Sequence, residues 1–120
     1  MGTWGTGIFD NDVALDVQDT FEDALSEGLD VSTASRYILE KFSKEVADSD
    51  DGPVVYLALA ALQLGQESVQ PEIKEKAMSI ITSGQDLDRW KEAGADTLAE
   101  RKQVLEQLKT RLSAVEQRAD

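Results

Sequence analysis

Residues 53–64 read PVVYLALAALQL, and this run decides the fold. It is apolar almost all the way round a helical turn, which is typical of a helix that is buried on every side. The eleven residues from Val54 to Leu64 are the longest apolar stretch of the chain, about half of what spans a bilayer. Pro53 suits the first turn of a helix. We therefore expect a central helix from Pro53 to Leu64, buried inside a globular domain.

Glycines follow segments of helical periodicity on both sides of this run, at Gly28, Gly65, Gly84 and Gly94. A glycine in the left-handed conformation commonly closes a helix, so each marks an expected helix end. The other expected helices run from a cap at Asp10 or Asn11 to Glu27, from Ser32 or Thr33 to Val46, from Pro71 onward, from Leu87 to Ala93, and from Thr97 to Arg118. The sequence thus predicts an all-α fold, a compact single-domain bundle of five to six helices over residues 1–120.

Several of these helices have a clear inward face. The helix that ends at Val46 carries Ala34, Ile38 and Phe42 at four-residue spacing. In the last helix, Thr97 and Glu100 form an expected capping box, and one apolar seam follows, made of Leu98, Leu105, Leu108, Leu112 and Val115. We expect a long amphipathic C-terminal helix, with residues 116–120 frayed.

Charge is concentrated in one part of the chain. The net charge is −12, from 24 acidic and 12 basic residues. Residues 10–51 hold thirteen of the acids and three of the bases, a local net of −10. This asymmetry favours a basic protein as partner and disfavours nucleic acid and anionic membrane.

The acids of the first expected helix form a ridge. Asp12, Asp16, Asp19 and Asp23 fall within about 60° of each other around the axis, and Glu27 lies beside them. The opposite side is apolar. This pattern fits either a solvated face or a docking surface for cations, and we name as candidate partner-binding residues Asp12, Asp16, Asp19, Glu22, Asp23, Glu27, Asp48, Asp50 and Asp51. The first six are called the acidic ridge below.

Little in the sequence indicates catalysis or a bound metal. The chain has neither cysteine nor histidine, and neither Asp10–Asp12 nor Asp48–Gly52 continues into a calcium-loop spacing. We expect no enzyme activity, no cofactor and no metal. The lack of cysteine and of a visible secretory signal favours a cytoplasmic location.

The first nine residues, MGTWGTGIF, alternate glycines with large apolar side chains. We interpret them as a plug pinned to the core by Trp4, Ile8 and Phe9. Two alternatives are a phosphate cradle, which Asp10 and Asp12 disfavour, and N-myristoylation, which normally needs basic neighbours.

The opening MGTWGTGIFDND, followed by Ala14 and Asp16, resembles the start of a family of short, mainly bacterial proteins known as domain of unknown function 4259. The resemblance implies a small helical domain and supplies no activity. It also implies that the opening carries a family signature, structural in role, at Trp4, Gly5, Gly7, Phe9, Asn11 and Asp12.

Two functional hypotheses follow. In the first, the protein is an inhibitor or immunity-type factor whose acidic ridge covers the cationic groups of a basic effector, such as a toxin or nuclease. In the second, it is a helical adaptor or a self-associating module that makes contacts through Trp90 or the seam from Leu98 to Val115. Salt should weaken the first kind of complex and barely affect the second.

Overall fold

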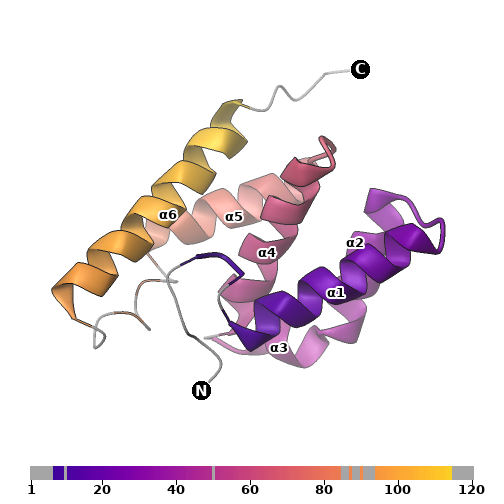
Figure 1. The fold of residues 1–120 in the computed structure, drawn as a ribbon, viewed down its shortest axis with the longest axis horizontal. Helices are drawn as coiled ribbons and strands as arrows, with labels where there is room; N and C mark the ends of the chain where they lie inside the picture. The colour runs from indigo at the N-terminus through magenta and orange to yellow at the C-terminus, as the bar shows by residue number, and fades with distance from the viewer. Residues whose placement is uncertain are drawn as a thin grey trace.

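The computed structural model describes residues 7–9, 11–49, 51–84, 87, 90 and 94–114, which form six helices (Figure 1). They are α1 (Asp12–Ser26), α2 (Val31–Lys41), α3 (Ser43–Ala47), α4 (Asp51–Gly65), α5 (Pro71–Ser83) and α6 (Ala95–Ala114). The predicted all-α fold and long C-terminal helix are confirmed. Three predictions fall wholly or partly outside the described residues. They are the plug residue Trp4, the frayed residues 116–120, and the short helix at Leu87–Ala93, of which only Leu87 and Trp90 are described.

Helix α4 is the centre of the fold, as the apolar run predicts. Figure 1 shows it between the α1–α2 pair and the α5–α6 pair, and it contacts α1, α3, α5 and α6. Four consecutive residues from Leu57 to Ala60 have no solvent exposure, so the helix is covered on every side. It begins two residues before the predicted Pro53, where the Asp48 carboxylate accepts a hydrogen bond from the Asp51 N–H at 3.1 Å.

The prediction of one continuous helix from Ser32 or Thr33 to Val46 is wrong, because the structure has two helices there, α2 and α3. The chain bends at Phe42, with φ −99° and ψ 28°, and this residue ends α2 and starts α3. The inward face was predicted correctly, because Ala34, Ile38 and Phe42 are buried and Val46 packs against the core. The start also differs: Asp30 caps α2 by accepting the Thr33 N–H at 2.8 Å.

Two of the four predicted glycine stops are confirmed. Gly28 and Gly84 are left-handed, with φ of 97° and 74°. Gly84 directly follows α5, and Gly28 follows α1 after the cap residue Glu27. Gly65 instead remains helical as the last residue of α4. The left-handed position two residues later is taken by Glu67, with φ 55°, and the Ser68 N–H then donates to the Gln63 carbonyl at 3.0 Å.

The N-terminus of α6 is also different from the prediction. The Leu98 N–H donates to the carbonyl of Gly94 at 3.0 Å, so the helix starts at Ala95. Thr97 therefore lies inside the first turn, and the predicted capping box with Glu100 is wrong. Gly94, with φ 103°, precedes this helix.

One fully buried polar side chain ties three segments together. The Gln63 amide nitrogen in α4 donates to Ser35 Oγ in α2 at 2.8 Å and to Gln70 Oε1 at 2.9 Å. The Gln63 oxygen accepts the backbone N–H of Gln70 at 2.9 Å. This network fixes the connection between α4 and α5 against α2, and nothing in the apolar pattern of α4 predicted it.

Candidate functional site

The acidic ridge lies on the solvent side of α1. All six of its residues are exposed: Asp12, Asp16, Asp19, Glu22, Asp23 and Glu27. The buried side of α1 is formed by Ala14, Val17, Phe21 and Ala24. The apolar stripe predicted opposite the ridge had Val13 in place of Ala14, and Val13 is half-buried against the core. At 1.5 Å per residue, the ridge extends for about 22 Å along the helix. The helix therefore presents one continuous anionic face.

The ridge carboxylates have no partners of their own. Within the described part of the chain, none of the six forms a hydrogen bond or an ion pair through its side chain, and α1 contains no lysine or arginine. They also do not converge, because the described residues hold no cluster of three or more carboxylates suited to a metal ion. The ridge is thus a row of separate anionic groups rather than a chelating site.

An apolar side chain, Leu15, borders the ridge. It lies about 60° around the helix axis from Asp12, close to Asp19 and Glu22. Its side chain is half-buried but is absent from the group that packs against the core, whereas Val13 and Leu25 of the same helix belong to that group. Apolar side chains fill the centre of protein interfaces and charged groups lie at their rim, so Leu15 offers an apolar contact on this face. The sequence pattern did not single out Leu15, because the apolar stripe expected on this helix lies opposite the carboxylates.

The three other candidate acids are not part of this face. Asp48 has a structural role as the hydrogen-bond acceptor at the start of α4, and Asp51 is half-buried in the first turn of that helix. Asp50 lies outside the described residues. The structure therefore places the six ridge acids on one exposed face, and it shows Asp48 as a hydrogen-bond acceptor at the start of α4 instead.

Three of the four described signature residues, Gly7, Phe9 and Asn11, have structural contacts, whereas the fourth, Asp12, does not. Asn11 caps α1, because its Oδ1 accepts the Ala14 N–H at 2.8 Å, and its side chain is buried. Ile8 and Phe9 pack against the core. Asp12 is exposed, and Trp4 and Gly5 lie outside the described residues.

A buried arginine of the last helix contacts this N-terminal segment. Arg101 of α6 is only 2% exposed, and its Nη1 donates to the carbonyl of Gly7 at 3.1 Å. Its guanidinium carbon lies 5.2 Å from the centre of the Trp90 ring, within range of a cation–π contact. This cluster was not predicted, although Arg101 falls on the same helix face as Leu105, Leu108 and Leu112.

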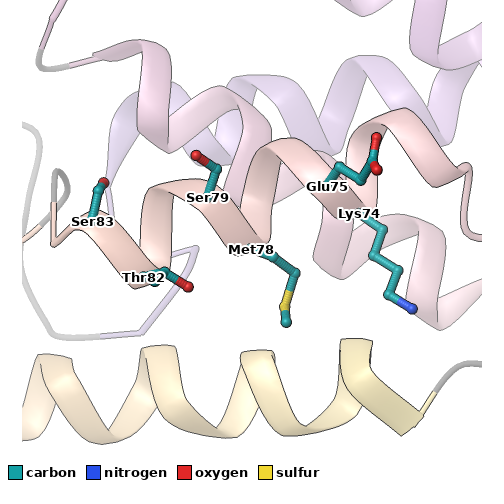
Figure 2. A pocket seen from close by; sticks show the side chains of 6 residues that line it. All are labelled: Lys74, Glu75, Met78, Ser79, Thr82 and Ser83. Atoms are coloured by element: carbon teal, nitrogen blue, oxygen red, sulfur yellow. The ribbon is translucent and has the colours of Figure 1, made fainter.

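The outer surface of α5 carries a shallow hollow of about 490 Å³. Figure 2 shows the side chains that line it: Lys74 and Met78 extend toward α6, whereas Ser79 and Ser83 point away from that helix. The Ser83 hydroxyl donates to the carbonyl of Ile80 at 3.2 Å, so it is engaged by its own helix. The hollow lies on one solvent-facing helix surface and is separate from the ridge on α1.

No helix in the described part of the chain combines the length and the apolar character needed to cross a bilayer. No curated protein and no solved structure is significantly similar to the chain. A protein-family model does match it, over residues 2–118, and its description is domain of unknown function (DUF4259). Because that match spans nearly the whole chain, the protein belongs to the DUF4259 family.

Proposed function

We propose that this protein is a non-catalytic acidic binding protein, an inhibitor or immunity-type factor that occludes a basic effector protein with its acidic ridge. The observation that carries the proposal is the row of six exposed, unpaired carboxylates on a helix without a single cation. The effector class we propose is a basic toxin or nuclease, met in the cytoplasm.

The energetics of α1 support a partner for this row. Five pairs of ridge residues are three or four positions apart: 12 and 16, 16 and 19, 19 and 22, 19 and 23, and 23 and 27. Each like-charge pair of this kind costs about 0.2–0.5 kcal/mol, so the row costs about 1–2.5 kcal/mol at low salt. The helix dipole offsets only the charge in the first turn, at Asp12. Cations supplied by a partner would relieve the remaining repulsion.

The mechanism is electrostatic capture followed by coverage. An anionic face about 22 Å long attracts a cationic surface over the Debye length, about 8–10 Å at moderate salt, and so speeds the first encounter. In the complex, the carboxylates pair with the lysines and arginines that the effector needs for its own substrate. Leu15 supplies an apolar contact beside these charges, where exclusion of water strengthens the neighbouring ion pairs.

The burial of most of the proposed contact residues gives less support to the alternative hypothesis, an adaptor or self-associating module. Trp90 and the seam residues Leu105, Leu108 and Leu112 are buried within the chain's own core or beside it, and Leu98 is half-buried. Val115 lies outside the described residues. A partner could reach most of this seam only if α6 left its place against α5 and α4. We therefore prefer the ridge as the binding surface.

The test compares three baits in an affinity pull-down from lysate of the source cell. The first is the wild type, and the second is a ridge variant with Asp12→Asn, Asp16→Asn, Asp19→Asn and Asp23→Asn. The third is a control variant with four exposed acids elsewhere changed, Glu40→Gln, Glu75→Gln, Glu100→Gln and Glu106→Gln. Both variants change the net charge from −12 to −8, so they remove the same amount of charge from different places on the surface.

We expect a basic protein to be retained by the wild type and the control variant, lost by the ridge variant, and released by moderate salt. Retention of the same proteins by all three baits would contradict the proposal. Capture of DNA or RNA as the main ligand at moderate salt would also overturn it, because the charge of the chain disfavours polyanions.

A further inference from the structure

We draw no further inference here: the strongest candidate, the buried cluster of Trp90, Arg101 and Gly7 at the N-terminal half of α6, leaves the Trp90 indole N–H without an acceptor, but that atom is sealed from solvent and nothing in the described part of the chain shows what would reach it.

Discussion

Replacing Gly52 with alanine should separate α3 from α4. Gly52 is the second residue of α4 and is buried. A Cβ atom at this position would lie 2.6 Å from the carbonyl oxygen of Val46 and 3.4 Å from its carbonyl carbon. Both of those atoms belong to the backbone, so no side-chain rotation can relieve the contact, and α3 must move.

The magnitude follows from two opposing effects. Forcing an extra methyl group into a packed site costs about 1–3 kcal/mol. Alanine is favoured over glycine in a helix by up to about 1 kcal/mol, which offsets part of that cost. We expect a net loss of about 1–2 kcal/mol in the free energy of unfolding, equivalent to a fall of about 4–8 °C in Tm for a chain of this length.

The same helix provides a matched control. Gly65, the last residue of α4, is exposed, and a Cβ atom there would meet nothing within 4 Å. Gly65→Ala should therefore raise the free energy of unfolding by up to about 1 kcal/mol. Urea unfolding followed by far-UV circular dichroism measures both variants. If Gly52→Ala were as stable as Gly65→Ala, the close approach of α3 to α4 would be refuted.

Three further predictions concern local features of the fold. Glu67→Gly should raise Tm, since a left-handed non-glycine residue costs about 1–2 kcal/mol, and a lower Tm in a thermal melt would argue against the φ of 55°. Gln63→Leu should lower the free energy of unfolding in urea by about 1–3 kcal/mol, because the buried Ser35 hydroxyl and the half-buried N–H of Gln70 both lose their hydrogen-bond partner; an unchanged free energy would show that the network contributes nothing. Hydrogen bonds from Thr33 lower the pKa of Asp30 below its ordinary value of 3.8. The ionised Asp30 cap therefore stabilises the folded state above pH 3.8, and this stabilisation is lost as the pH falls through the folded-state pKa. The stability difference between wild type and Asp30→Ala should therefore shrink below pH 3.8 in urea melts across pH, and a constant difference would count against this cap.

Long apolar patterns and helix ends with strong local signals could be predicted from the sequence. The run at residues 53–64 is apolar on all sides, so its central position followed from periodicity alone. The cap of α1, predicted at Asp10 or Asn11, is Asn11, and Gly28 and Gly84 end helices as predicted; all three features rest on local backbone chemistry. The exposure of the acidic ridge followed equally from its position opposite an apolar stripe.

The errors arose where tertiary packing overrides local preference. Neither glycine nor proline marks the bend at Phe42, and the bend lets α3 lie with its Val46 carbonyl directly against Gly52. Glu67 adopts a left-handed conformation although Gly65 is two residues away, because the loop to α5 is held by the hydrogen bonds of Gln63 and Gln70. From the sequence alone, Arg101 would be expected at the surface. Its contacts with Gly7 and Trp90 join residues that are distant in the chain, so they could not be predicted from local patterns.

The most direct test of the central claim is the salt dependence of the association rate between this protein and the basic protein that it captures. Stopped-flow measurements would compare the wild type, the ridge variant and the control variant across NaCl concentrations from about 0.05 to 0.5 M, over which charge interactions become screened. Equilibrium unfolding should show that the ridge variant is as stable as the wild type or slightly more stable, because the four substitutions remove repulsion from an exposed face.

At low salt we predict that the ridge variant associates at least about tenfold more slowly than the wild type, within the range of electrostatic steering, and that added salt removes most of this difference. The control variant should stay within about twofold of the wild type, because its charges are lost away from the binding face. Equal slowing of both variants would mean that only net charge matters, and unchanged rates would mean that the ridge serves solvation alone; either result would contradict the proposal that the acidic ridge is the binding surface.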